Sequence, residues 1–289
     1  MVFSHYAVAY LDILGFSEFV KEAEDNSRPE KLIALKKLFE EVIPREISID
    51  GKNASYPDNM ELRCLSFSDS IVVSAPLEVK GSYPALIAVS IKAIQISHSL
   101  LDMGLLVRGG IAVGNAYQTN SNILGTGYQE AVKMDKGAPQ ITLAESAEKE
   151  LGNLIKCGRP RYSIFARNEQ GNIILNSIHP EPTYMPDKSG TVAEYYKKYR
   201  EIIFGNLNKL NSQEHSQAKD KWIWFARLFN ANIKYFSLSS IPIDDELLTV
   251  SINYLNPPDT EGSSTSFDWM KHFTAPGMKI QFNSTKEKN

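Results

Sequence analysis

The chain has 289 residues, of which 43% are hydrophobic and 22% are charged, the ordinary balance of a globular protein with a sizeable core. It contains 31 Lys and Arg residues against 34 Asp and Glu residues, so its net charge of −3 gives no sign of a nucleic-acid polymer or an anionic membrane as a partner. At about 150 residues per domain, this length allows one large domain or two modest ones.

The cysteines and the N-terminal residues bear on the cellular compartment. Cys64 and Cys157 cannot build a disulfide framework, and their spacing matches no zinc motif. Residues 1–16 lack the basic segment and the small-residue cleavage site of a signal peptide. No uncharged apolar run approaches the roughly 18 residues that a membrane helix needs. We therefore expect a reduced, cytoplasmic, soluble protein with no membrane partner.

The predicted elements begin with a buried strand over residues 6–13, where apolar side chains fall on both alternating faces. A short helix is expected over residues 17–24, and a helical period of apolar residues extends over 29–44. A polar stretch at 50–59 separates these helices from the next pair of strands. The later predicted elements are strands at 61–67 and 70–76, a helix at 83–103, a strand at 105–117, a hairpin tip at 118–122 that leads into a segment at 123–134, a helix at 144–156, a hairpin at 161–178, and helices at 192–207 and 218–236.

This order of elements predicts the α+β class, with helices laid against a mainly antiparallel sheet in a sandwich. The composition changes after about His179, where residues 180–190 are rich in Pro, Gly and charge. We therefore predict a first domain over residues 1–180, followed by a helical C-terminal extension and tail over residues 181–289.

Asp12 ends the first predicted strand, where a carboxylate among apolar residues is unfavourable unless another group compensates its charge. It can serve as a helix cap or a hydrogen-bonded turn residue, or it can be a metal ligand. In the second case phosphate oxygens can be held by the backbone N–H groups that follow it, those of Ile13, Leu14, Gly15, Phe16 and Ser17.

Asp69 lies in the tight turn at residues 68–70, where Asp is also the default turn residue. If the strands at 6–13 and 70–76 are neighbours, Asp12 and Asp69 project from the same edge of the sheet. Two carboxylates can hold a pair of divalent cations that bridge a triphosphate, activate an attacking oxygen and stabilise the leaving group. The pair therefore indicates a metal-dependent nucleotide site.

Glycines interrupt the strand at 105–117, where Arg108 is followed by Gly109, Gly110 and, later, Gly114. Such glycines mark a bulge or the close approach of a backbone or ligand, and a strand packed under a helix explains them equally well. The segment 125–127 is too short for a phosphate-binding loop and is expected to open the next helix.

Four segments, in chain order over roughly residues 5–180, resemble the motifs of class III nucleotidyl cyclases. Residues 10–16 look like the F-x-D-I-x-G-F segment, and the turn at 68–70 stands where this family has its second metal-binding Asp. Residues 108–114 match R-x-G-I-x-x-G, and residues 122–133 keep the spacing of D-I-x-G-x-x-x-N-x-A-x-R.

The resemblance implies a class III cyclase fold in which Asp12 and Asp69, with Ile13 beside them, hold two Mg²⁺ or Mn²⁺ ions. The 3′-oxygen of a nucleoside triphosphate would attack the α-phosphorus and expel pyrophosphate, leaving a 3′,5′-cyclic nucleotide. In this family the site lies between two subunits. Gln129 and Lys133 of one chain would then act with the carboxylates of the other chain in a homodimer.

Two pairs of positions depart from the family pattern. The ribose-orienting Asn is Gln129 here, and the transition-state Arg is Lys133, a point charge in place of a bidentate fork. Adenylate cyclases read the base with a Lys where this chain has Leu65 and with an Asp where it has Asn122. Leu65 cannot contact a purine as Lys does, whereas Asn122 offers both donors and an acceptor to a pyrimidine edge. These departures argue against ATP as the substrate.

The chain looks most like the bacterial pyrimidine cyclases of the Pycsar anti-phage systems, because of the A-x-x-x-D/E run at 130–135 and the helical extension containing residues 221–229. The resemblance implies that UTP, before CTP, is converted to a cyclic nucleotide that activates a separately encoded effector. Two alternatives stay open. One is a cyclase-like module that senses a nucleoside triphosphate without turning it over, which Gln129 and Lys133 favour, and the other is a purine cyclase.

Three further features have candidate roles. The last predicted helix carries four aromatic residues, Trp222, Trp224, Phe225 and Phe229. We expect them to dock the C-terminal helices on the first domain rather than to stack on bases. His5 has no partner pattern and is expected to be structural. The resemblance implies one basic contact to the triphosphate from the later part of the domain, and three residues compete for it, Arg159, Arg161 and Arg167.

Overall fold

Strand β1 (Ser4–Leu14) lies at the centre of the fold, between β5 (Ser70–Pro76) and β6 (Leu106–Gln118), and pairs antiparallel with both. The computed structural model describes residues 3–24, 29–43, 46–49, 52–55, 62–78, 83–119, 121–157, 164–181, 184, 191–211, 217–238, 243 and 253–254. These residues belong to one compact unit, Met1–Pro257, and the second unit, Pro258–Asn289, lies outside the described residues.

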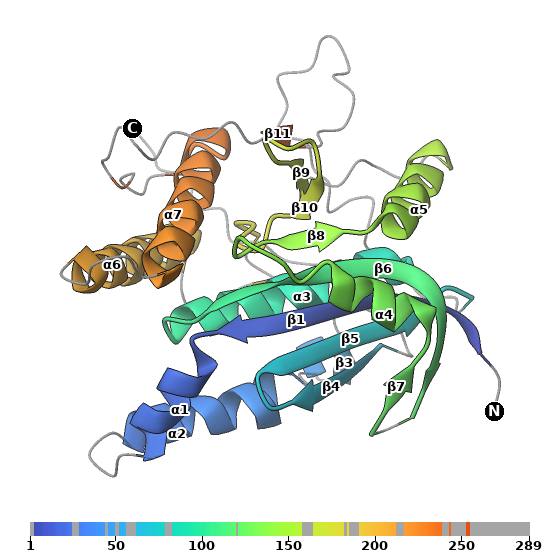
Figure 1. The fold of residues 1–289 in the computed structure, drawn as a ribbon, viewed down its shortest axis with the longest axis horizontal. Coiled ribbons are helices and arrows are strands. Elements are labelled where there is room, and N and C mark those ends of the chain that lie inside the picture. Colours follow the sequence, from blue (N-terminus) through green and yellow to red (C-terminus); the bar gives the residue numbers. More distant parts are fainter. Residues whose placement is uncertain are drawn as a thin grey trace. The chain divides into compact units, whose positions relative to one another are not determined.

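The main sheet is mixed but mostly antiparallel, as the sequence predicts (Figure 1). Its strand order is β11-β9-β10-β8-β6-β1-β5-β4, with β7 paired to β6, and only β6 and β8 run parallel. The remaining strands are β4 (Arg63–Phe67), β7 (Ile123–Leu124), β8 (Ile141–Leu143), β9 (Phe165–Arg167), β10 (Ile173–Leu175) and β11 (Asn253–Tyr254).

Helices cover both faces of this sheet, which explains why β1 is apolar on both sides. Helix α3 (Ala85–Asp102) packs against β1, β5 and β6 on one face. On the other face, Val8 and Val72 pack with Ala131 of α4 (Thr126–Lys133). The other helical elements are α1 (Phe16–Glu24), α2 (Pro29–Lys37), the π-helical turn η1 (Leu38–Val42), α5 (Glu145–Lys156), α6 (Val192–Asn211) and α7 (Gln217–Tyr235).

Most predicted elements are confirmed, and the differences lie in short strands. The prediction that residues 50–59 form only a polar connection is wrong. Strand β3 (Lys52–Ser55) lies within this stretch and pairs antiparallel with β2 (Glu46–Ile49). Strands β8 and β11 are too short, at three and two residues, to leave a periodic signal.

The two C-terminal helices dock on the rest of the described chain through aromatic side chains. Phe225 and Phe229 of α7 are buried in one cluster with Tyr196 of α6 and with Leu106 and Ile178 from earlier in the chain. The prediction of a docking face is therefore confirmed. The cluster joins residues from both sides of the predicted domain boundary at 180, which stays a prediction.

Within the described residues, α3 is the one helix long and apolar enough to span a membrane, and 94% of it is buried inside the fold.

Candidate active site

Asp12 and Asp69 come to the same end of the sheet. In the pairing of β1 with β5, Asp12 lies opposite Ser70, and Asp69 occupies the turn that joins β4 to β5. The N–H of Ile13 donates to the carbonyl oxygen of Asp69 at 2.8 Å, which ties this turn to the end of β1. The expectation that the two strands are neighbours is thus confirmed.

Arg108 lies on the other side of Asp12 and neutralises it. The pairing of β1 with β6 sets Arg108 opposite Asp12, and the guanidinium meets Asp12 Oδ2 through Nε at 3.0 Å and through Nη2 at 2.9 Å. The same Nε lies 2.7 Å from Oδ1 of Asp135, just beyond the end of α4. One guanidinium is therefore shared by two largely buried carboxylates.

This environment changes the acidity of Asp135. Burial raises the pKa of its carboxyl group, and the negative charge of Asp12 raises it further, while Arg108 and Lys221 act in the opposite direction. Nearby, the hydroxyl groups of Tyr10 and Ser70 are hydrogen-bonded at 2.8 Å, and burial raises the pKa of Tyr10. The end of the sheet thus holds several polar groups inside a largely apolar frame.

The turn from β1 into α1 contains the residues for which phosphate contacts are predicted. Gly15 has φ of +84°, a left-handed conformation that favours glycine, and its carbonyl accepts the N–H of Phe19 at 3.1 Å to start the helix. The first N–H groups of a helix have no partner inside it, and both Gly15 and Ser17 are exposed here. Leu14 and Phe16 are half-buried at the same turn.

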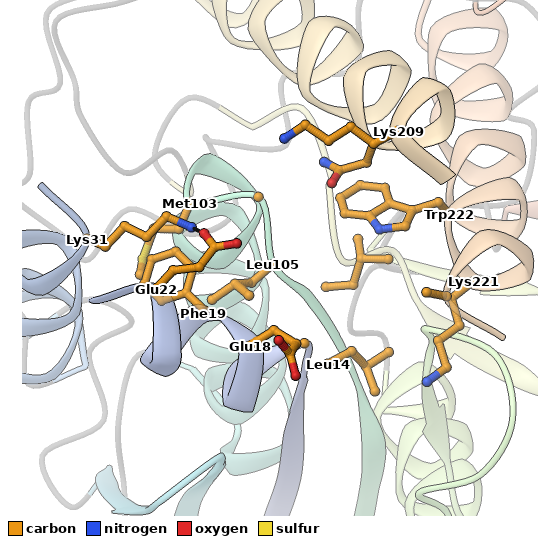
Figure 2. A pocket seen from close by; sticks show the side chains of 15 residues that line it. Leu14, Glu18, Phe19, Glu22, Lys31, Met103, Leu105, Lys209, Lys221 and Trp222 are labelled. Carbon is orange, nitrogen blue, oxygen red and sulfur yellow. Dashed lines mark ion pairs between the residues drawn. The ribbon is translucent and has the colours of Figure 1, made fainter. Parts of the chain in front are cut away.

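A cavity of about 330 Å³ opens beside Leu14 and Gly15, between α1, α2 and the two C-terminal helices (Figure 2). Three lysines line it, Lys31 from α2, Lys209 from α6 and Lys221 from α7. Lys31 is paired with Glu22 and lies over the ring of Phe19, 4.6 Å from its centre. Burial, with the charge of Lys209, lowers the pKa of Lys31.

A second cavity, of about 530 Å³, adjoins the ion-paired centre and is lined by Arg108, Gly137, Ala138, Asp220, Lys221 and Trp224, among others. Lys221 borders both cavities, and in Figure 2 its ammonium points away from Lys209. Neither Lys221 nor Asp135 is recognisable as a site residue from the sequence. Lys221 stands at the start of an aromatic helix, and only the docking of that helix brings it to the site.

Two of the glycines of β6, Gly110 and Gly114, are explained by α4, which lies directly on this strand, whereas Gly109 lies against the backbone of Tyr10 in β1. A Cβ atom at Gly110 would lie 2.3 Å from Cβ of Met134 and 2.5 Å from the carbonyl oxygen of Ala131. A Cβ atom at Gly114 would be 2.9 Å from Gly127 Cα. The expected close backbone approach is confirmed, with a helix as the neighbour, and residues 125–127 do open that helix.

Gln129 and Lys133 are both exposed, and they lie four residues apart on α4, on the same side of the helix. Asn122 is exposed at the turn between β6 and β7, where its N–H donates to Oγ1 of Thr119 at 3.0 Å. Leu65 is only 8% exposed and belongs to the apolar cluster beneath α4. Roles for these four residues stay predictions.

The remaining candidates have simpler surroundings. Arg167 donates to the carbonyl oxygen of Gly171 at 2.7 Å across the β9–β10 hairpin, while Arg159 and Arg161 lie outside the described residues. His5 is exposed near the start of β1. Cys64 and Cys157 are free thiols.

The donor set at the sheet end fits a divalent cation that arrives with a nucleotide. Among the residues that the structure describes, no three His, Cys, Asp or Glu side chains come together as a metal site. Mg²⁺ and its relatives need no such cage, because they are held by one or two carboxylates together with substrate phosphates. Asp12 and Asp69 would supply those carboxylates, and Asp12 already faces a cationic group.

Comparison with known proteins adds little to what the geometry of the site indicates. No family model matches the chain, and no curated protein matches it. A solved structure described as a class III adenylyl cyclase-like ATP-binding protein from Pseudomonas aeruginosa is similar with a TM-score of 0.31 and 12% sequence identity, over 54% of this chain. The match spans only 37% of that protein's length. A likeness this distant assigns neither an activity nor a ligand to this chain.

Proposed function

We propose that this protein is a metal-dependent nucleotidyl cyclase, which converts a pyrimidine nucleoside triphosphate, UTP in preference to CTP, to its 3′,5′-cyclic monophosphate and pyrophosphate. The observation that supports this most is the hydrogen bond from Ile13 to the carbonyl of Asp69, which brings the turn carrying Asp69 beside the strand end carrying Asp12. Mg²⁺ or Mn²⁺, when bound, supplies neutralisation of the phosphate charge and activation of the attacking 3′-oxygen.

The chain's own residues account for binding and orientation. Asp12 and Asp69 would present carboxylate oxygens at one sheet end, and the N–H groups of the exposed residues Gly15 and Ser17 would donate to phosphate oxygens. Lys221 adds a positive charge near the same place, which favours a bound polyanion, whereas the charge of Arg108 is already compensated by Asp12 and Asp135. Most of the rate enhancement would come from this positioning and charge compensation.

The remaining groups would come from a second copy of the chain. Gln129 and Lys133 point to solvent from one face of α4, so they are available to a partner subunit. In a two-fold symmetric homodimer each such contact occurs twice, which gives two equivalent sites. Gln129 would hydrogen-bond the ribose, and Lys133 would neutralise charge on the transferring phosphoryl group.

Base selection would depend on Leu65 and Asn122. Leu65 offers only an apolar contact, whereas the amide of Asn122 is exposed and carries both donors and an acceptor. This combination favours a pyrimidine over ATP. A cyclic pyrimidine nucleotide made in this way would serve as a second messenger in anti-phage defence, acting on a separate effector.

The test is to incubate the purified protein separately with each of the four nucleoside triphosphates and Mn²⁺, and to identify the products by mass. The proposal predicts cyclic UMP, with less cyclic CMP. Cyclic AMP or cyclic GMP as the main product would support the cyclisation reaction but contradict the role in pyrimidine selection proposed for Leu65 and Asn122.

One observation favours a second candidate, a nucleotide-sensing module without turnover. Lys133 replaces the bidentate Arg that the cyclase motif would have, and Gln129 replaces the shorter Asn. If these substitutions only slow the reaction, Lys133→Arg should raise kcat roughly tenfold with little change in nucleotide affinity. A sensing module would bind UTP tightly and form no cyclic product, either as the natural chain or as the Lys133→Arg variant.

A further inference from the structure

Arg108 makes unequal contacts with its two carboxylates. Its Nε–H donates to Oδ2 of Asp12, and Nη2 lies near the same oxygen, so the hydrogen-bonding edge is directed at Asp12. Oδ1 of Asp135 lies 2.7 Å from the same Nε in an ion pair, but the Nε–H is directed at Asp12, so this buried oxygen has no well-aligned hydrogen bond. A buried carboxylate oxygen with a misaligned donor is less stable than one with a well-aligned hydrogen bond.

A small rotation of the guanidinium would satisfy Asp135 and release Asp12. The Nε–H is already within hydrogen-bond distance of Asp135, so only its direction has to change. A divalent cation at Asp12 would repel the guanidinium and favour that rotation. Without a second carboxylate, the same cation would have to compete with Arg108 for Asp12.

We propose that Asp135 is a positioning residue that takes over Arg108 and thereby frees the Asp12 carboxylate for a divalent cation. This inference rests on the proposed metal-dependent function. The proposed effect of Asp135 on the metal is exerted through Arg108, with which it is ion-paired.

The test measures Mn²⁺ affinity directly, by electron paramagnetic resonance of free Mn²⁺ in titrations of the full chain. The titrations are made with and without 3′-deoxy-UTP, which lacks the attacking hydroxyl, so that turnover plays no part. Four forms are compared: the natural chain, Asp135→Asn, Arg108→Gln and the double variant. Asp135→Asn should weaken Mn²⁺ binding by about tenfold, the usual effect of losing a partner of a metal ligand.

The double variant separates positioning from direct ligation. When Arg108 is already Gln, nothing competes for Asp12, so adding Asp135→Asn should change the Mn²⁺ affinity by less than about twofold. An equal loss with and without Arg108 would make Asp135 a ligand and overturn the inference, as would an unchanged affinity in Asp135→Asn. Arg108→Gln removes the cationic partner of Asp12 in both the single and the double variant, so the comparison between these two forms isolates the effect of Asp135.

Two controls complete the comparison. Asp220→Asn removes an exposed negative charge from the lining of the cavity that Arg108 borders, and it should leave Mn²⁺ affinity within about twofold. Asp135→Glu should restore most of the lost affinity. A natural chain that cyclises nucleotides but shows no effect of Asp135→Asn contradicts this inference alone, whereas one that binds no Mn²⁺ and forms no product contradicts the proposed function as well.

Discussion

The proposed activity depends on two carboxylates, Asp12 near the end of β1 and Asp69 in the turn between β4 and β5. Asp12→Asn and Asp69→Asn each remove a carboxylate charge while keeping the size of the side chain, so we expect the fold to survive. Cyclase activity should fall by at least about 10³-fold in each variant, because neither cation can then be held against the triphosphate. Product analysis by mass and circular dichroism of the same samples check both expectations.

The matched control for these variants is Asp220→Asn, which removes a comparable charge from an exposed position on α7. It should keep most of the activity of the natural chain. Full activity in both Asp12→Asn and Asp69→Asn would contradict the assignment of the metal ligands.

The sequence predicts the two carboxylates because each interrupts an apolar pattern, which is visible without a structure. The pairing of Arg108 with Asp12 and Asp135 is different, since it arises when β6 lies beside β1 and α4 ends above them. The approach of Lys221 likewise depends on how α7 docks. Residues that meet only through tertiary packing leave no local signal in the chain.

At the scale of elements, the contact between β6 and α4 depends on glycine. Gly110→Ala would force a methyl group to within 2.3 Å of Met134 Cβ and 2.5 Å of a carbonyl oxygen, so α4 would have to move. We expect a loss of about 3 kcal/mol in the free energy of unfolding, measured by urea denaturation. Activity should fall as well, because α4 carries Gln129 and Lys133.

Gly152→Ala is the matched control, since Gly152 lies within α5 and a Cβ atom there would meet nothing within 4 Å. It should raise the free energy of unfolding by about 0.5–1 kcal/mol, the ordinary gain from replacing glycine in a helix. Equal effects of the two substitutions would show that α4 does not pack directly on β6.

Helix α3 is linked to α6 by a buried histidine. The imidazole of His98 lies 3.0 Å from the hydroxyl of Tyr199 and 3.0 Å from the carbonyl oxygen of His179. Burial lowers the pKa of His98 to about 4 and that of His179 to about 3. Both rings therefore stay neutral in the folded state, while the unfolded chain takes up protons below about pH 6.5. Stability should consequently fall as the pH drops from 6.5 towards 4.

Between pH 7 and pH 5 each of these histidines should lower the free energy of unfolding by about 2 kcal/mol. His98→Gln should remove the contribution of His98 to this pH dependence. The free energy of unfolding of the variant should then fall by about 2 kcal/mol less between pH 7 and pH 5 than that of the natural chain. His5→Gln, at an exposed position, is the matched control substitution. The same pH dependence in His98→Gln and the natural chain would contradict a neutral buried His98.

The elements themselves are largely predictable from the sequence, because α3, α6, α7 and the central strands carry long apolar patterns. The short strands are not, since β8 pairs through only three residues and owes its existence to its place beside β6. The hairpin of β2 and β3 likewise lies where the composition indicates a polar connection.

For the whole molecule, we expect each site to be built from two chains. Asp12→Asn and Lys133→Ala should each be inactive alone, because each removes one half of every site. Co-expressed in equal amounts, they form heterodimers in which one of the two sites is intact. Random pairing then restores about one quarter of the activity of the natural homodimer. Activity no higher than that of the separate variants would place all the site residues within one chain.

The most direct test of cyclase activity is a single competition reaction. The natural chain and Asp12→Asn are each incubated with an equal mixture of ATP, GTP, CTP and UTP and with Mn²⁺, and the cyclic products are identified by mass. We expect cyclic UMP to dominate with the natural chain, cyclic CMP to follow, and Asp12→Asn to form neither. A folded natural chain that forms no cyclic nucleotide from any of the four would contradict the proposed cyclase activity.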